Sequence, residues 1–386
     1  MRRSLFSLLG LITFWSLFYA GIKYYFLWLY DHDFAPTLEG ISGFVLIGSM
    51  IAYSIWGFLY ARYSERIMLF IALGLWVVSF LISVLLPQIS PLFFNIGMIG
   101  VGLAYSLYVI GKNTLIGREI LTSELGSSTI GAYTTIVFIV FLVFWTVVGS
   151  KIGEIWWWVI IGIIYFILLL LFVGGILFLV DTRRETSPFQ FSLALYRKLF
   201  LRYGVFMIAL GCFWQISVEA SQVAVNYSRD IFDKSISASS LLLLFSSIGA
   251  ILGNVISVKF AEKRLLGFTI FSTVFIALIF AFSTILGLAK SLDQYAIVQA
   301  LAFFVGLFFG WAVNLGESYF YSLLGNDPDK DYTSALYGFT LSLVGAITMF
   351  ASEKILHTGS YTGISIFLGF LALFALYGGR KGINSR

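Results

Sequence analysis

The chain has 386 residues, of which 60% are hydrophobic, 18% are aromatic and only 11% are charged. A soluble domain carries about 25% charged residues, and no soluble fold could cover so much apolar surface. These proportions exclude the disordered, nucleic-acid-binding and cytosolic-enzyme classes, so most of the chain is expected to lie in lipid. We therefore attribute the net charge of +5 to cytoplasmic loops rather than to a nucleic-acid partner.

Cysteine and histidine are scarce. The single cysteine, Cys212, excludes an internal disulfide. The two histidines, His32 and His357, are too few for a metal cluster. The sequence contains no Walker-type phosphate loop, and we expect neither a metal nor a cofactor.

Long apolar runs predict twelve spanning helices. Each needs about 20 mostly apolar residues, because every backbone N–H and C=O in lipid must be satisfied within the segment. In chain order the expected ranges are 5–29, 41–61, 67–86, 92–116, 129–150, 155–180, 203–227, 237–258, 265–289, 296–323, 335–356 and 364–379. The first run follows two arginines, but it is too long for a signal peptide and lacks a small-residue cleavage site, so we expect a retained helix.

The lysines and arginines predict the orientation. With both termini in the cytoplasm, 17 of the 24 lie on the cytoplasmic side and 5 on the other, while Lys23 and Lys112 fall within spans. Because cytoplasmic loops are enriched in basic residues, we expect a multi-pass protein of the plasma (inner) membrane with both termini inside.

The longest polar interruption, 181–202, divides the chain into two predicted six-helix bundles, 1–180 and 203–386. Ser187 can cap a helix that has Pro188 at its first position. Basic residues on this segment would face anionic headgroups, so we expect a short interfacial helix in a cytoplasmic linker.

The two halves also resemble each other in sequence. Phe14-Trp15 returns as Phe213-Trp214, the basic loop 62–66 returns as 259–263, and Gly111-Lys112 aligns with Gly316-Glu317. The offsets of 199, 197 and 205 residues are similar and fall on corresponding helices. They predict a duplicated six-helix unit.

Residues 57–66, GFLYARYSER, resemble the loop motif of the major facilitator superfamily, a glycine followed by Asp-Arg, Gly and a basic pair. Ala61 stands where the aspartate is usual and Ser64 where the second glycine is usual. The resemblance covers the whole chain and implies an all-α membrane protein with twelve helices, in two six-helix halves related by pseudo-twofold symmetry (the major facilitator fold).

The same motif supplies a candidate gating loop of Gly57, Arg62, Glu65 and Arg66. Gly57 permits close helix packing, and both arginines can bond the C-terminal carbonyls of neighbouring helices. Glu65 can substitute for the missing aspartate. The alternative is that the arginines only fix topology.

A narrower similarity is to proton-coupled peptide transporters. Residues 18–23, FYAGIK, resemble their aromatic-Gly-x-basic stretch in helix 1, and residues 112–117, KNTLIG, resemble their lysine-bearing segment in helix 4. In that family two acidic residues and an arginine precede the first stretch. This signature is missing here, where Ser16 and Leu17 stand in that neighbourhood. The Gly-Pro signature of drug antiporters is absent from 129–150.

Four charged residues lie inside predicted spans and at least four residues from either end, namely Lys23, Lys112, Glu219 and Glu317. A charge within a span costs about 2.5–3.5 kcal/mol, so each is a functional candidate. In the resembled fold, their helices 1, 4, 7 and 10 line the central cavity. Helical spacing adds neighbours on the same faces: Tyr19 beside Lys23, Tyr108 beside Lys112, Gln215 and Gln222 beside Glu219, and Asn314 beside Glu317. Trp214 is a candidate cavity wall.

Opposite charges in the two halves suggest two alternating pairs, Lys23–Glu219 at the outer mouth and Lys112–Glu317 at the inner one. Protonation of either glutamate would break its pair, which would couple transport to protons. The alternative is that the lysines snorkel to the membrane surfaces. The peptide transporters use comparable helix 1–7 and helix 4–10 pairs.

The sequence thus predicts a monomeric secondary transporter that moves a small zwitterionic or amphiphilic solute, such as an amino acid or short peptide, by alternating access. The alternatives are an exporter or flippase of lipophilic compounds or lipids, and a transport-dead accessory protein of the same fold. A membrane enzyme is disfavoured, because no histidine lies in a span and the internal acids are on different helices.

Overall fold

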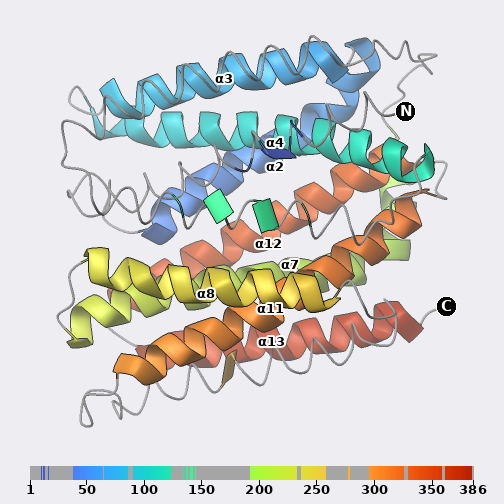
Figure 1. The fold of residues 1–386 in the computed structure, drawn as a ribbon. Coiled ribbons are helices and arrows are strands. Elements are labelled where there is room, and N and C mark those ends of the chain that lie inside the picture. The colour runs from blue at the N-terminus through green and yellow to red at the C-terminus, as the bar shows by residue number, and fades with distance from the viewer. Residues whose placement is uncertain are drawn as a thin grey trace.

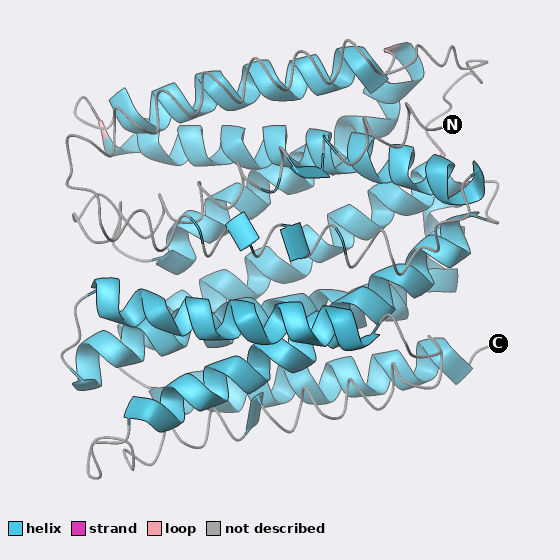
Figure 2. Cartoon of the chain, viewed as in Figure 1, coloured by secondary structure: helices cyan, strands magenta, loops and turns pink. Residues whose placement is uncertain are grey.

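The computed structural model describes eight long stretches of the chain and a few residues between them. These are residues 38–63, 65–85, 90–122, 192–232, 236–257, 295–325, 329–358 and 361–384, together with 10, 12–13, 16, 133, 136–137, 140–141, 144 and 277–278. All regular secondary structure among these residues is α-helical (Figure 2).

Eight helices make up the described part of the fold. They are α2 (Leu38–Arg62), α3 (Glu65–Leu85), α4 (Pro91–Thr122), α7 (Leu193–Phe232), α8 (Ile236–Ser257), α11 (Tyr295–Gly325), α12 (Lys330–His357) and α13 (Tyr361–Asn384). Each contains most or all of one predicted span. The other predicted spans, 5–29, 129–150, 155–180 and 265–289, lie almost wholly outside the described residues. Among those described, α4, α7, α11, α12 and α13 are long and apolar enough to cross a membrane.

The helices form two groups that meet along α12 (Figure 1). In the first group α4 packs against both α2 and α3. In the second, α7 packs against α12 and α13, and α8 packs along α11. Because α12 contacts both α2 and α7, it joins the two groups.

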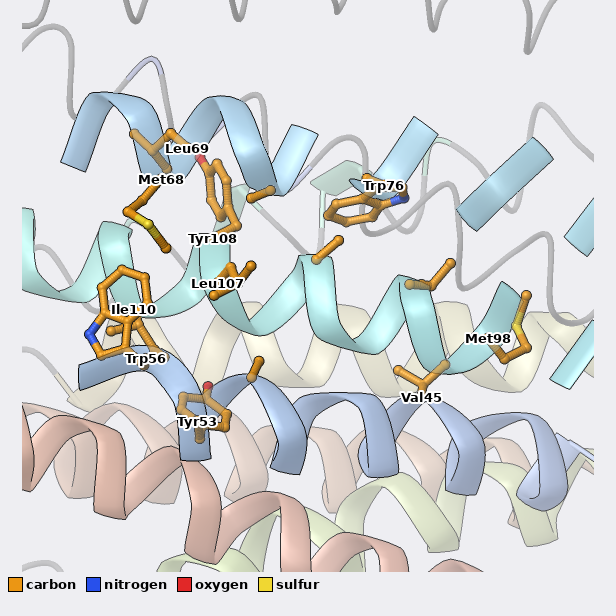
Figure 3. Packing of buried hydrophobic residues seen from close by; sticks show 14 of the residues in the cluster. Val45, Tyr53, Trp56, Met68, Leu69, Trp76, Met98, Leu107, Tyr108 and Ile110 are labelled. Atoms are coloured by element: carbon orange, nitrogen blue, oxygen red, sulfur yellow. The ribbon is translucent and has the colours of Figure 1, made fainter. Parts of the chain in front are cut away.

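Each group has its own apolar core. The N-terminal core gathers Trp56, Met68, Trp76 and Tyr108 from α2, α3 and α4 (Figure 3), and it also takes in Ala335 from α12. The C-terminal core is built from α7, α11, α12 and α13. Large apolar side chains also cover the outside, as on α13, where the Phe370 side chain is 68% exposed. An apolar exterior of this kind suits a protein surrounded by lipid.

The helix α7 begins earlier than the sequence predicts. The Ser192 Oγ accepts a hydrogen bond from the Leu195 backbone N–H at 3.2 Å, which caps the helix at its N-terminus. The helix then runs unbroken through the expected boundary at 202/203. No glycine or proline interrupts residues 193–203, and Leu199 is buried in the C-terminal core. The described part of the predicted linker is therefore the start of α7, while Ser187 and Pro188 lie outside the described residues.

Two glycines bring α2 and α4 into backbone contact. A methyl group at Gly48 of α2 would overlap the Ile99 carbonyl of α4, and one at Gly102 of α4 would overlap the Val45 carbonyl of α2. The contacts are reciprocal, because each glycine lies against the carbonyl of the residue three positions before the other glycine. Small residues that let backbones approach closely are a common way for helices to associate in membranes.

The helices α8 and α11 pack in the same way. A methyl group at Gly249 would overlap the Phe303 carbonyl, and one at Gly306 would overlap the Ser246 carbonyl. Gly253 and Gly310 repeat these contacts one turn further along. The pair is therefore held by two Gly-x-x-x-Gly stretches that face each other.

Candidate functional site

The seam between the two helix groups runs along α2 and α12, which are antiparallel. A methyl group at Gly338 of α12 would collide with the Tyr53 ring of α2, while one at Gly43 of α2 would lie 2.7 Å from Cζ of Phe350 on α12. The Phe350 ring also packs edge-on against Phe44, with the ring centroids 6.2 Å apart. Glycines on both helices thus receive bulky side chains from the opposite group.

The predicted site residue Gln215 lies at the middle of this seam. A methyl group at Gly345 of α12 would be 2.6 Å from the Gln215 Nε2 and 2.8 Å from Cδ1 of Leu46 on α2. The absence of a side chain at Gly345 therefore lets α7, α12 and α2 meet at one point. The Gln215 side chain is 7% exposed, and its Oε1 has no hydrogen-bond partner among the described residues.

Trp214, the neighbour of Gln215 on α7, faces α11. Its ring packs edge-on against Phe309, with the centroids 5.1 Å apart and the planes at 80°. Successive residues on a helix point about 100° apart, so Trp214 and Gln215 contact different helices. Of the two, Gln215 is the one that reaches the other helix group.

Asn314 lies on the α8 side of α11. It is 1% exposed, and its Nδ2 donates a hydrogen bond to the Ser257 Oγ at 2.6 Å. The Ser257 Oγ donates to the Asn254 carbonyl at 2.7 Å. The structure thus brings Asn314 together with residues of α8, not with Gln215.

Tyr108 belongs to the N-terminal core. It is 3% exposed and points from α4 toward α3, beside Leu69 (Figure 3). Of the remaining predicted residues, Tyr19 and Lys23 lie outside the described part. The structure places the backbone of the others within helices but does not describe their side chains: Gly57 and Arg62 on α2, Glu65 and Arg66 on α3, Lys112 on α4, Glu219 and Gln222 on α7, and Glu317 on α11.

Sequence reasoning missed two kinds of residue. Gly345 holds the junction around Gln215, but nothing in its local sequence indicates which helix it faces. Asn254 and Ser257 of α8 complete the contact with Asn314. A lone asparagine in the apolar run 237–258 was a signal that could have found Asn254, since polar residues in such runs are costly.

No protein-family model and no curated protein matches the chain. Solved structures of transporters do match, over 97–100% of its length. A bacterial homologue of the iron transporter ferroportin, in the outward-facing state, aligns with a TM-score of 0.73 over 100% of both chains at 13% identity. The fucose:proton symporter of E. coli aligns with a TM-score of 0.67 over 97% of both chains at 12% identity. The human organic anion transporter MFSD10 aligns with a TM-score of 0.65 over 98% of this chain and 99% of that chain, also at 12% identity.

Proposed function

We propose that this multi-pass membrane protein, whose chain has the fold of the major facilitator transporters, is a secondary transporter that works by alternating access. The compared structures support this function, because each is of a transporter and is matched over 97% or more of its length. These transporters are named for fucose, organic anions and iron, which are chemically unrelated. The substrate must therefore be argued from this chain's own residues.

Gln215 carries the proposal. A buried amide with an unpartnered oxygen is costly unless something binds it. This one lies where α7, α12 and α2 meet, between the two helix groups, which is where transporters of this kind bind their substrates. In the proposal the Gln215 Oε1 accepts a hydrogen bond from an N–H or O–H group of the solute.

The alternating motion is proposed to take place along the α2–α12 seam. Along this seam, bulky side chains of one helix pack against glycines of the other, as the Tyr53 ring packs against Gly338. The packing of a ring against a glycine is van der Waals contact, which two rigid groups can remake as they tilt against each other.

A duplicated six-helix unit, with bundles 1–180 and 203–386, is part of the proposal. The glycine contacts of α2–α4 and α8–α11 support it, since Gly48 and Gly249 are 201 residues apart and Gly102 and Gly306 are 204 apart. These offsets fall within the range of 197 to 205 seen in the sequence repeats. Two independent kinds of comparison thus align the same helices.

Proton coupling through Glu219 and Glu317, paired with Lys23 and Lys112, completes the proposed mechanism. Basic residues on one wall and acidic ones on the other would suit a zwitterionic solute such as an amino acid or short peptide. The protein would act as a monomer in the plasma (inner) membrane, with both termini in the cytoplasm.

The test is uptake into proteoliposomes, with a panel of amino acids, peptides, sugars and lipophilic compounds, with and without a pH gradient. We expect gradient-driven uptake of a zwitterion. Glu219→Gln or Glu317→Gln should abolish this uptake while leaving counterflow. Gln215→Ala should lower it about tenfold through loss of a buried hydrogen bond. The control is Gln299→Ala, which changes a partly buried glutamine near the start of α11.

The outcomes separate the alternatives. Uptake of lipophilic compounds alone would favour the exporter or flippase. No transport of any solute by folded protein would favour the accessory role. Unchanged uptake by Gln215→Ala would remove the residue from the proposed site.

A further inference from the structure

A buried cluster of amide and hydroxyl groups lies between α8 and α11. We call it the amide cluster and define it as Asn254, Ser257 and Asn314. Their side chains are 0%, 0% and 1% exposed. Asn254 also lies over Gly310 of α11, where an added methyl group would be 2.7 Å from its Nδ2. The glycine contacts therefore bring all three residues close to the helix–helix interface.

The hydrogen bonds determine how both amides are turned. The Ser257 hydroxyl has one hydrogen, which it donates to the Asn254 backbone carbonyl at 2.7 Å. The Ser257 Oγ can then only accept from Asn314, so the Asn314 Nδ2 faces it at 2.6 Å. The Asn254 Nδ2 lies 2.8 Å from the Ala250 carbonyl, which can only accept. Flipping the Asn254 amide would lose its bond, and flipping the Asn314 amide would take the Ser257 hydrogen away from the Asn254 carbonyl.

Two acceptors remain. The Oδ1 atoms of Asn254 and Asn314 are buried and have no hydrogen-bond partner among the described residues. Buried acceptors of this kind are rare in folded proteins and costly when nothing binds them. Both amides, moreover, are held in the orientation that leaves their oxygens available.

Glycine packing alone does not explain the cluster. The pair α2–α4 has the same glycine register, and the positions that correspond to Asn254, Ser257 and Asn314 at offsets of 201 and 204 are Tyr53, Trp56 and Ile110. These belong to the apolar N-terminal core. A glycine-packed pair can therefore continue with apolar residues, and the polar ones on α8 and α11 call for another reason.

The two unpartnered Oδ1 atoms limit the kinds of ligand that the cluster can bind. Neutral amide oxygens bind a cation or a hydrogen-bond donor, and carbonyl oxygens at membrane depth are known ligands of sodium. A divalent ion would ordinarily require carboxylates, and no group of three histidine, cysteine or acidic residues that could hold a metal occurs in the described part of the chain.

From this arrangement we infer that the amide cluster is a sodium site, in which the Oδ1 atoms of Asn254 and Asn314 bind the ion. The Ser257 hydroxyl fixes the Asn314 amide in the binding orientation. The inference goes beyond the proposed function and does not rest on it, because binding can be measured on the purified protein without any transport.

The test is thermal unfolding of the purified full chain in detergent, with sodium chloride replaced stepwise by choline chloride at constant ionic strength. Sodium should raise the Tm saturably, by about 5 °C at a hundredfold excess over the Kd. Equilibrium binding of radioactive sodium should give one site per chain. Asn254→Ala and Asn314→Ala should each remove the Tm shift and the binding.

Two further variants keep the test decisive. Asn226→Ala removes a buried asparagine on α7 and should retain the sodium shift. Asn314→Asp keeps the ligand oxygen and adds a negative charge, so it should bind sodium at least tenfold more tightly, even if the alanine variants fail to fold.

Three outcomes would overturn the inference. One is a Tm that is the same in sodium and in choline, as expected if water completes the network. Another is a shift that persists in both alanine variants. The last is an aspartate variant whose sodium affinity is unchanged. Failure of the uptake experiments would leave this result untouched, because no solute is involved.

Discussion

The helix pairs α2–α4 and α8–α11 pack alike and then diverge. In both, a glycine on each helix lies against a carbonyl of the other, at Gly48 and Gly102 in one pair and at Gly249 and Gly306 in the other. Beyond this contact the first pair continues into the apolar N-terminal core, whereas the second continues into the amide cluster.

The glycine contacts that the two pairs share and the residues at which the pairs differ have different physical roles. Glycine contacts give close backbone packing, which lipid-embedded helices need because lipid provides no hydrophobic drive for association. The buried amides join α8 and α11 through one side-chain hydrogen bond and leave two acceptors unpartnered among the described residues. The comparison therefore assigns assembly to the glycines and ligand binding to the positions where the pairs differ.

The largest effect is expected when a methyl group is added to one packing glycine in each helix pair. Gly102→Ala would overlap the Val45 carbonyl, and Gly306→Ala would overlap the Ser246 carbonyl. Since backbone cannot give way as a side chain can, each should lower the free energy of unfolding by about 3 kcal/mol or more. Thermal or denaturant unfolding in detergent measures the loss.

The matched control is Gly74→Ala on α3, where an added methyl group meets nothing within 4 Å. Its effect should stay within about 1 kcal/mol. If only one of the two packing variants is destabilised beyond this control, the helix pairs are not equivalent.

A smaller effect is expected where the two helix groups meet. Gly345→Ala would bring a methyl group to 2.6 Å from the Gln215 Nε2 and 2.8 Å from the Leu46 Cδ1. Both atoms are ends of flexible side chains, so we expect a loss of about 2 kcal/mol. Gln215→Ala should recover part of the loss in the double variant, which a double-mutant cycle measures. Strict additivity would show that Gln215 does not share the space at Gly345.

Hydropathy alone predicted helices at every place where the structure describes one, because lipid requires long apolar helices. It misplaced the start of α7, because the sequence becomes apolar only after Arg202 whereas the helix is already continuous from Leu193. The spacing of Gly249 and Gly253 was readable from the sequence, but the Phe303 and Leu307 carbonyls they contact were not. For the same reason sequence reasoning grouped Asn314 with Glu317 and missed Asn254: partners across helices depend on packing.

The role of the amide cluster can be tested by replacing its two asparagines, so that the pair α8–α11 becomes apolar like the pair α2–α4. The double variant Asn254→Leu with Asn314→Leu removes both unpartnered oxygens together with their donors. The Ser257 hydroxyl still donates to the backbone carbonyl of residue 254 in this variant, so no partner is left unsatisfied and the replacement should be close to neutral or stabilising. Without sodium, we expect the free energy of unfolding to rise by about 1 kcal/mol. With sodium, the variant should fall below the parent protein, and identical stabilities in both salts would contradict the sodium site.

One serine in each pair extends the comparison to single hydroxyl groups. The Ser49 Oγ on α2 lies 3.1 Å from the Val45 carbonyl and 3.2 Å from the Gly102 carbonyl, which are long contacts from a single hydroxyl hydrogen. Backbone carbonyls within helices already accept N–H bonds, so Ser49→Ala should cost about 0.5 kcal/mol or less. Ser257→Ala instead strips the Asn314 Nδ2 of its acceptor and should cost about 1–2 kcal/mol. Unfolding measured side by side checks the order, and a larger loss at Ser49 would show that the N-terminal pair depends on its polar contact as well as on its glycines.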